Sequence, residues 1–347
     1  ILADEMGLGK TVQALAMLLH RAEEGPALVV APTSVGAGWM QEAERFAPEL
    51  EVRSYRGPRR EKLLEELGPK VVLVTSYDIL ARNPEELEGV DFATVIFDEA
   101  QAMKNARTRR AKAARRLQAR WRLALTGTPL ENHLGELWSL FRIVSPGLLG
   151  TWPHFKRRFA LPIERDGDEE RRLALARKLR PFLLRRTKKE VAPELPPRTE
   201  VVRPVEMSEA ERRIYEAARG EALESLAGAG ERFDVLAAMT RLRLLACHPR
   251  LVDPTTTVKS AKLEAFLELV DELREDGHRA LVFSQFTSLL GLVRDALDLR
   301  GVDSLYLDGS TPAKKRPGLV QEWQEGDAPL FLISLKAGGT GLNLTGA

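Results

Sequence analysis

The first eleven residues, ILADEMGLGKT, place two glycines, a lysine and a threonine directly before a helical pattern. Gly7 and Gly9 let the backbone turn tightly and bare its N–H groups, and apolar residues recur at helical spacing in the following TVQALAMLLHRAEE. Such a loop is suited to phosphate: Lys10 can reach the terminal phosphates of a nucleotide, and Thr11 can contact Mg²⁺. The full pattern G-x-x-x-x-G-K-[ST] is not met, because Asp4 stands where the first glycine is required. A helix start with a solvated lysine is the alternative interpretation.

An acidic pair in VIFDEAQ, residues 95 to 101, directly follows an apolar strand pattern. In phosphoryl transfer, Asp98 can hold Mg²⁺ together with Thr11, and Glu99 can polarise the attacking water. A helix N-cap explains an acidic pair at this position equally well. A third polar turn, TGTP at 126–129, ends another apolar strand pattern. The presence of all three groups in one α/β region favours nucleotide hydrolysis.

The elements that must position these groups alternate between strands and helices. Apolar, β-branched runs predict strands at 28–32, 51–55, 70–76, 93–100 and 122–129, with helices between them that include 58–67. This alternation implies a parallel sheet covered on both faces, in which ligands collect at the carboxyl ends of the strands. The segments ILAD, DEAQ and TGTP all lie at such ends, so we expect one crevice to hold them.

The pattern changes after residue 130 to helices without strands, including stretches at 171–186 and 207–228. Strand patterns return at 279–286, 303–309 and 329–337. We therefore predict three parts: a first α/β lobe at 1–130, a helical insertion and bridge at 131–258, and a second, incomplete α/β lobe at 259–347.

Composition bounds the class of protein. The chain has 347 residues, 44% hydrophobic and 29% charged, which is ordinary for a folded globular protein. No apolar run approaches the roughly 18 residues that cross a bilayer, so we expect no membrane partner. Cys247 is the only cysteine and the five histidines are scattered, so neither a disulfide nor a cysteine zinc site is expected. The first residue is Ile1 rather than Met, and we expect the natural N-terminus to be missing.

Basic residues gather in two runs although the net charge is only +2. Residues 104–122 contain nine basic residues and no acidic one, and residues 177–190 are nearly as one-sided. A solvated helix face explains most such runs, while a phosphate track for nucleic acid is the alternative.

The motif series as a whole resembles that of the Swi/Snf family of DNA-dependent ATPases, within the second helicase superfamily. The resemblance spans the chain in the expected order and rests on these segments: DEMGLGKT, VVAPTSV, TSYDIL, FDEAQAMKN, LALTGTPLEN, LRPFLLRRTKKEV, LVFSQF, LDGSTP and LKAGGTGLNLT. The first and last of them distinguish this family from RNA helicases with the same core. Asp4 in the phosphate loop is normal within the family.

The resemblance implies a fold of two RecA-like lobes, the P-loop NTPase helicase core, with a helical insertion between them. It implies a motor that uses ATP and Mg²⁺ to move along double-stranded DNA by its phosphate backbone, without sequence preference and generally without separating the strands. A strand-separating helicase or a restriction-type translocase shares the same motifs and remains the alternative. DNA-bound proteins such as polymerase or nucleosomes are candidate further partners, and the oligomeric state is open.

Site roles follow from the resemblance residue by residue. The nucleotide site comprises Gly7, Leu8, Gly9, Lys10 and Thr11, with Lys10, Asp98 and Glu99 as catalytic residues, Thr11 and Asp98 at the metal, and Gly338 and Gly341 contributed by the second lobe. The DNA path is lined by Pro32, Thr33, Ser76, Tyr77, Ser284, Gln285 and Thr340. The coupling segment that links nucleotide state to lobe movement is Thr126, Gly127 and Thr128.

Two parts of the family pattern are not found in the sequence: an upstream segment that contacts adenine and an arginine-bearing motif that completes the site. Because an arginine finger contributes roughly 10³- to 10⁵-fold in rate, we expect these residues alone to turn ATP over poorly. The Arg-, Ala- and Leu-rich composition favours a prokaryotic source, and hence a cytoplasmic, nucleoid location rather than a nuclear one.

Overall fold

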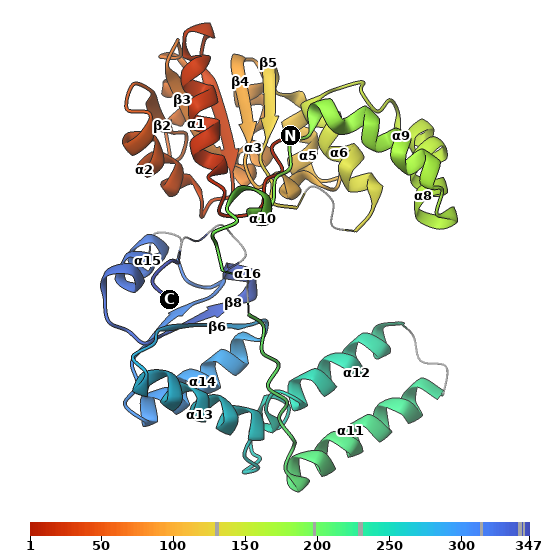
Figure 1. Cartoon of the computed structure of the whole chain (residues 1–347), viewed down its shortest axis with the longest axis vertical. Coiled ribbons are helices and arrows are strands. Elements are labelled where there is room, and N and C mark those ends of the chain that lie inside the picture. The colour runs from red at the N-terminus through yellow and green to blue at the C-terminus, as the bar shows by residue number, and fades with distance from the viewer. Residues whose placement is uncertain (129–131, 197–198, 228–231, 313–314, 339–341, 343) are drawn as a thin grey trace. The chain divides into compact units, whose positions relative to one another are not determined.

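A computed structural model of the chain describes every residue except 129–131, 197–198, 228–231, 313–314, 339–341 and 343; of the side chains at 226–234 nothing is described. The chain divides into two compact units, Ile1–Pro197 and Arg198–Ala347, each with its own parallel sheet (Figure 1). The helices that follow residue 131 belong to the first unit as far as residue 197. The three-part division at 130 and 258 stays a prediction.

The sheet of the first unit has five parallel strands in the order β2-β3-β1-β4-β5. They are β1 (Ala27–Ala31), β2 (Glu51–Ser54), β3 (Val71–Ser76), β4 (Asp91–Phe97) and β5 (Gln118–Ala124). The sheet extends past β5, because Leu2 pairs in parallel with Leu125 on one side and with Leu184 on the other. The α/β fold with parallel sheets is thus confirmed, and the strand that leads into GLGKT lies beside the strand that ends at TGTP.

Helices cover both faces of this sheet. α1 (Lys10–His20) and α2 (Gly36–Phe46) pack on one face through side chains such as Leu15 and Trp39. The other face is covered by α3 (Tyr77–Arg82), α4 (Pro84–Glu88), α5 (Arg109–Arg116) and α6 (Leu134–Val144). Burial on both faces explains why β1 and β3 read as continuous apolar runs rather than alternating ones.

One predicted helix of this unit is wrong. Residues 58–67 form only a five-residue 3₁₀ turn, Arg60–Leu64. None of its side chains is fully buried, and Leu63 and Leu64 pack against the core only partly buried, so little packing stabilises a longer helix, and short helices are marginal without it.

The helical part of the first unit has its own apolar cluster, centred on Phe141, Phe155 and Phe159. It comprises α6, α7 (Trp152–Phe155), a π-helical turn (Lys156–Ala160), α8 (Leu161–Asp166), α9 (Glu169–Leu179) and α10 (Lys188–Val191). The predicted helix over 171–186 is wrong at its end, because α9 stops at Leu179 and a 3₁₀ turn containing Pro181 follows. Proline lacks the N–H that a continuing helix needs, so the chain leaves the helix there and becomes extended.

The second unit contains a three-stranded parallel sheet in the order β6-β8-β7. Its elements are α11 (Glu209–Ala227), α12 (Arg232–Leu245), α13 (Ala261–Glu275), β6 (Ala280–Ser284), α14 (Thr287–Leu299), β7 (Ser304–Leu307), α15 (Arg316–Glu325), β8 (Leu330–Ser334) and α16 (Leu335–Gly338). α13 and α14 pack on one face of the sheet, and α15 and α16 on the other.

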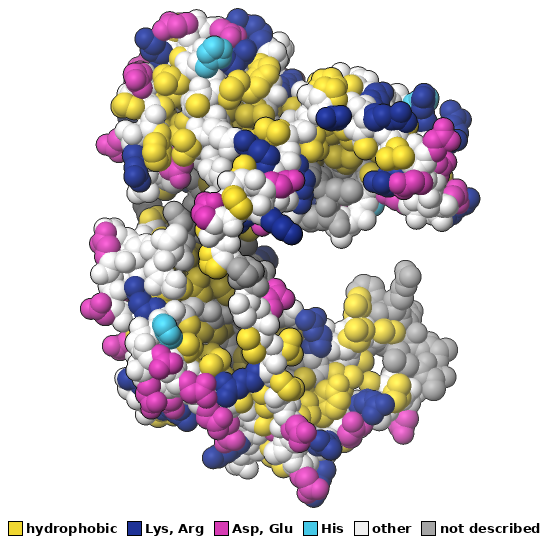
Figure 2. Space-filling view, in the orientation of Figure 1, with side chains coloured by type: hydrophobic (Ala, Val, Ile, Leu, Met, Phe, Trp, Pro, Cys, Tyr) yellow, Lys and Arg dark blue, Asp and Glu magenta, His cyan; other side chains and the backbone are white. Residues whose placement is uncertain are grey.

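The pair formed by α11 and α12 leaves apolar side chains in contact with solvent, among them Leu223, Leu236 and Met239. Hydrophobic atoms are visible over this pair in Figure 2. None of the helices in the described ranges combines the length and apolar character that crossing a bilayer requires.

Candidate nucleotide site

The phosphate loop has the backbone conformation that its glycines predict. Gly7 has φ +87° and Gly9 has φ +69°, both in the left-handed region that favours glycine. Gly9 immediately precedes α1, so the loop delivers the chain into a helix whose first residue is Lys10. The free N–H groups of a helix start therefore face the same region as the bare backbone of the loop.

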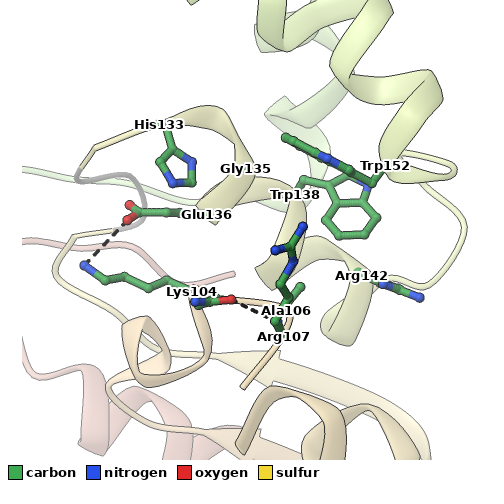
Figure 3. A pocket seen from close by; sticks show the side chains of 10 residues that line it. Lys104, Ala106, Arg107, His133, Gly135, Glu136, Trp138, Arg142 and Trp152 are labelled. Atoms are coloured by element: carbon green, nitrogen blue, oxygen red, sulfur yellow. Dashed lines mark hydrogen bonds and ion pairs between the residues drawn. The ribbon is translucent and has the colours of Figure 1, made fainter. Parts of the chain in front are cut away.

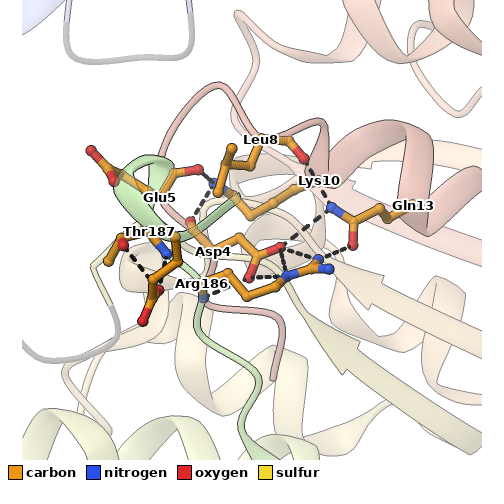
Figure 4. Close-up of polar contacts among 8 residues, drawn as sticks. Asp4, Glu5, Leu8, Lys10, Gln13, Arg186 and Thr187 are labelled. Carbon is orange, nitrogen blue, oxygen red and sulfur yellow. Dashed lines mark hydrogen bonds and ion pairs between the residues drawn. The ribbon is translucent and has the colours of Figure 1, made fainter. Parts of the chain in front are cut away.

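The Lys10 side chain folds back over this loop (Figure 4). Its ammonium group donates hydrogen bonds to the carbonyl oxygens of Asp4 at 2.8 Å and Glu5 at 3.2 Å. Carbonyl oxygens are weaker partners for an ammonium than phosphate oxygens, because only the latter carry net charge. Lys10 is thus placed at the loop by contacts that an anion can replace.

The acidic pair lies at the end of β4, and Asp98 there is almost fully buried. The indole N–H of Trp39 donates to Asp98 Oδ2 at 2.8 Å, and the Glu99 amide donates to Oδ1 at 2.8 Å. The hydroxyl of Tyr77 donates to the Asp98 carbonyl oxygen at 2.8 Å. Trp39 of α2 and the Glu99 amide therefore fix the orientation of the carboxylate, while Tyr77 of α3 holds the Asp98 backbone.

The electrostatics of Asp98 connect it to the phosphate loop. Burial raises its pKa to about 6, and the neighbouring Glu99 charge acts in the same direction. The Trp39 hydrogen bond and the positive charge of Lys10 act in the opposite direction. The charge of Lys10 therefore reaches Asp98, as it must if the two side chains serve one phosphate site.

Glu99 is held in an unusual conformation, with φ +48° and ψ +53°. Gln101 donates a hydrogen bond to its carboxylate at 2.6 Å, and the hydroxyl of Thr126 donates to the Gln101 side-chain oxygen at 2.9 Å. The Thr128 amide in turn donates to the Thr126 hydroxyl at 3.1 Å. A continuous chain of hydrogen bonds thus joins Glu99 to the predicted coupling segment.

The coupling segment also touches the phosphate loop directly. A side chain added at Gly127 would come within 3.0 Å of Met6 in the loop. The three strand ends therefore lie side by side within the first unit: Leu2 hydrogen-bonds along 124–126, and the Ala100 amide donates to the Leu125 carbonyl. The crevice itself stays a prediction.

The residues present fit a hydrated magnesium ion. Each Asp98 oxygen accepts one hydrogen bond, and a carboxylate has about four acceptor sites, so capacity remains. The Thr11 hydroxyl makes no hydrogen bond within the described part of the chain. Oxygen donors of this kind are the ligands that magnesium prefers.

Sequence reasoning missed three contributors to this site: Trp39, Gln101 as a side-chain partner of Glu99, and Arg186. Arg186 lies in the extended segment after α9 and forms an ion pair with the buried Asp4. Its signals in the sequence are the basic run at 177–190 and the motif segment LRPFLLRRTKKEV, and neither indicates Asp4 as its partner.

The predicted DNA-path residues of the first unit lie at the ends of β1 and β3. Thr33 is exposed, and its carbonyl oxygen accepts a hydrogen bond from Arg56 at 3.2 Å. Ser76 and Tyr77 are buried: Ser76 caps α3 by accepting from the Ile79 amide, and Tyr77 bonds to Asp98. In this structure both side chains serve internal contacts, and their role at DNA, like that of Pro32, stays a prediction.

In the second unit, Ser284 and Gln285 lie at the end of β6. Ser284 accepts from the Phe286 amide, and Gln285 accepts from Arg243 at 2.6 Å. A side chain at Gly338 would lie 2.9 Å from Phe283, so close packing alone requires glycine there. Gly339, Thr340 and Gly341 lie outside the described residues.

Apart from the phosphate loop, the first unit has a cavity of about 610 Å³ next to the start of the basic run (Figure 3). Its wall includes Lys104, Arg107 and Arg142 together with the rings of Trp138 and Trp152. Lys104 forms an ion pair with Glu136 at 3.5 Å. The cavity combines positive charge with aromatic surface.

The basic run at 104–122 is divided between internal and solvated charges. Arg110 pairs with Asp78 at 2.6 Å and Arg116 pairs with Glu88 at 2.5 Å. Within the described part of the chain, the side chains of Lys112 and Arg115, on the same helix, make no ion pair. Part of the run therefore stays available to an external anion.

Comparison with known proteins places these features in a family. The SNF2-related domain matches residues 1–251 and the helicase conserved C-terminal domain matches residues 261–347. The putative ATP-dependent helicase/translocase YwqA of Bacillus subtilis is 39% identical over 100% of this chain and 40% of its own length. The ISWI chromatin-remodeling complex ATPase CHR17 of Arabidopsis thaliana is 36% identical over 100% of this chain and 34% of its own length. The chain thus spans well under half of these relatives.

Solved structures agree with the family match. The Sulfolobus solfataricus SWI2/SNF2 ATPase core in complex with dsDNA is 29% identical, with a TM-score of 0.53 over 96% of this chain and 73% of that one. The Sulfolobus solfataricus SWI2/SNF2 ATPase core domain is 31% identical, with a TM-score of 0.53 over 100% of this chain and 74% of that one. The chain therefore belongs to the SNF2 family and has the two parallel-sheet lobes of a SWI2/SNF2 ATPase core.

Proposed function

We propose that this chain is the core of an ATP-driven motor that moves along double-stranded DNA. It hydrolyses ATP to ADP and phosphate at the phosphate loop of the first unit, and DNA stimulates the reaction. The observation that carries the proposal is the convergence of Lys10, Asp98 and Glu99 on one site, held by Trp39, Gln101 and the loop backbone.

Each residue has a defined task in this proposal. The loop amides and Lys10 bind the terminal phosphates, and Lys10 exchanges its carbonyl partners for phosphate oxygens. Thr11 and Asp98 would hold Mg²⁺, which neutralises charge on the β- and γ-phosphates when bound with the nucleotide. Glu99 accepts a proton from the attacking water, and the Gln101 contact fixes the orientation of its carboxylate.

The hydrogen-bond chain from Glu99 to Thr128 supports coupling between the nucleotide and the rest of the motor. A change in the hydrogen bonding of Glu99 on phosphate release alters the Gln101 contact and, through Thr126, the coupling segment.

Double-stranded DNA as the partner is supported by two observations. The description of the similar Sulfolobus core names a complex with dsDNA. Among the residues that the structure describes, Lys112 and Arg115 have no ion-pair partner, which suits contacts to a phosphate backbone that carry no sequence information.

The proposal is tested by measuring phosphate release with and without duplex DNA, beside a triplex-displacement and a strand-displacement assay. We expect slow release that DNA stimulates and that Lys10→Ala abolishes, with displacement of a third strand but no separation of the duplex. Separation of the duplex strands would favour a helicase instead. Phosphate release that is insensitive to both DNA and Lys10→Ala would refute the motor.

A further inference from the structure

The segment from Leu184 to Val191, here called the return segment, brings the chain back from the helical part of the first unit to the phosphate loop. Its backbone runs beside residues 1–5 as an added parallel strand. The Leu184 amide donates to the Ile1 carbonyl at 2.9 Å, the Ala3 amide to Leu184 at 2.6 Å, and the Glu5 amide to Arg186 at 3.0 Å. The pairing continues up to the residue at which the loop begins.

Arg186 fastens the return segment to both ends of the loop (Figure 4). Its guanidinium group donates to both carboxylate oxygens of Asp4, which is fully buried, and to the Gln13 side-chain oxygen at 2.6 Å. Gln13 donates in turn to the Leu8 carbonyl at 2.9 Å. Burial alone would raise the pKa of Asp4, but the hydrogen bonds from Arg186 outweigh it and lower that pKa.

Lys188 is carried to the loop by the same segment. Its amide donates to the Glu5 carboxylate at 2.7 Å, and the capping box of Thr187 and Glu190 starts α10 at this residue. A methyl group built on Gly7 would lie 3.3 Å from Lys188 Cε and 3.4 Å from Nζ. The aliphatic end and the ammonium group of Lys188 therefore lie against the first glycine of the loop.

The Lys188 ammonium has no carboxylate partner within the described part of the chain. The Lys10 ammonium, by contrast, is engaged with the Asp4 and Glu5 carbonyls. A cation that lies against an anion-binding loop without a counter-ion has its charge available to the ligand of that loop, and the attraction is strongest at low ionic strength.

We propose that Lys188 is a second phosphate-binding cation of the nucleotide site and that Arg186 is the positioning residue that holds it there. This inference rests on the proposed function, since it assigns a ligand to the same loop. It also links the helical part of the first unit to the nucleotide, because the return segment follows α9 through the 3₁₀ turn Arg180–Phe182.

Lys189 offers a matched control. It follows Lys188 in the same short helix and is exposed, and within the described part of the chain no hydrogen bond or ion pair joins its side chain to the loop. Both lysines add positive charge near an anionic ligand and should raise its affinity to the same extent by that effect alone. Only Lys188 should contact the ligand directly.

The experiment measures the affinity of the full chain for fluorescent ADP and for a fluorescent non-hydrolysable ATP analogue, at low and high salt. We expect Lys188→Ala to weaken binding about tenfold at low salt and less at high salt, while Lys189→Ala changes it by less than about twofold. Lys188→Arg retains most of the affinity, because the charge is kept. Equal effects of Lys188→Ala and Lys189→Ala would overturn the inference.

Arg186 is tested by its coupling to Lys188. Arg186→Lys keeps one positive charge but loses the forked contact with Asp4, so it shifts the return segment without removing the counter-charge. We expect Lys188→Ala to weaken nucleotide binding less in the Arg186→Lys background than in the wild type. If the losses of affinity from the two substitutions simply add, Arg186 does not position Lys188. Failure of the wild type to bind either nucleotide more tightly than Lys10→Ala would refute the proposed function itself.

Discussion

The strand ends of the two parallel sheets differ in chemistry although the sheets share an architecture. In the first unit, Asp4 and Asp98 are buried carboxylates, each held by named hydrogen-bond donors. In the second unit, the end of β6 carries Ser284 and the exposed Gln285, neither of which ionises. Asp308, which follows β7, is only half-buried and accepts hydrogen bonds from the amides of Ser310 and Thr311. Among the described strand ends, fully buried carboxylates thus occur only in the first unit.

This difference indicates a division of labour. Burying a carboxylate costs free energy unless it is hydrogen-bonded, so a fold retains such groups where their charge is used. Hydroxyl and amide groups at a solvated strand end cost little and suit contacts with a phosphate backbone. We therefore expect substitutions in the first unit to change chemistry and stability, and those in the second to change the response to DNA.

The largest effect is expected from Glu99→Gln, which removes the proton acceptor but keeps the shape of the side chain. ATP turnover should fall by about 10²- to 10⁴-fold while nucleotide affinity changes little. Phosphate-release kinetics and nucleotide titration measure the two quantities. Glu44→Gln, on the exposed side of α2, is the matched control, and a similar loss in that variant would contradict the assignment.

The next largest effect is expected on the free energy of unfolding, when one ion pair in each unit is broken. Arg186→Ala leaves the buried Asp4 without its counter-charge and should lower the free energy of unfolding by about 3 kcal/mol. Arg300→Ala, which breaks a half-exposed pair with Asp271 at 2.7 Å, should cost less than about 1 kcal/mol. Chemical denaturation reports both, and equal costs would contradict the difference between the units.

A smaller effect follows from the pKa of Asp98, which is raised from 3.8 to about 6. Because the folded state holds this proton more tightly than the unfolded state, the contribution to stability is present at low pH and lost as pH rises through about 6. The Asp98→Asn side chain does not ionise, so this loss of stability is absent from the variant. The free energy of unfolding of Asp98→Asn, relative to that of the wild type, should therefore rise by about 1 kcal/mol between pH 5 and 7.5.

The control for this pH dependence is Asp91→Asn, at the exposed start of the same strand. Its stability relative to the wild type should not change over this pH range. An Asp98→Asn advantage that shrinks as pH rises would show that burial does not raise the pKa of Asp98.

The smallest effect is expected in the second unit. Gln285→Ala removes the acceptor for Arg243 and a side chain predicted to face DNA. We expect the concentration of duplex DNA needed for half-maximal stimulation to rise about two- to fivefold, with turnover in the absence of DNA unchanged. A loss of turnover without DNA would mean that this strand end takes part in the chemistry.

The strands and the phosphate loop could be predicted from the sequence because local signals determine them. Apolar runs identified the eight strands in the described part of the chain, seven of them to within three residues at either end, and glycine spacing predicted the positive φ angles of Gly7 and Gly9. The exception is β5, which begins four residues and ends five residues before the predicted 122–129. The meeting of three strand ends followed from parallel topology. These features depend on short-range pattern and on one general rule of sheet architecture.

The supports of the site could not be predicted, because they join residues far apart in the chain. The Trp39 bond to Asp98 and the Arg186 bond to Asp4 depend on tertiary packing. The helical periodicity of 171–186 concealed the extended return segment, and only Pro181 indicated a break. α12 and α13 were also missed.

The backbone of Glu99 is left-handed, a conformation that non-glycine residues adopt at a cost of roughly 1 kcal/mol or more. Glu99→Gly should therefore raise the free energy of unfolding and abolish ATP hydrolysis. The wild-type glutamate lowers the stability of the fold but supplies the carboxylate. At this position, selection on activity therefore outweighs selection on folding.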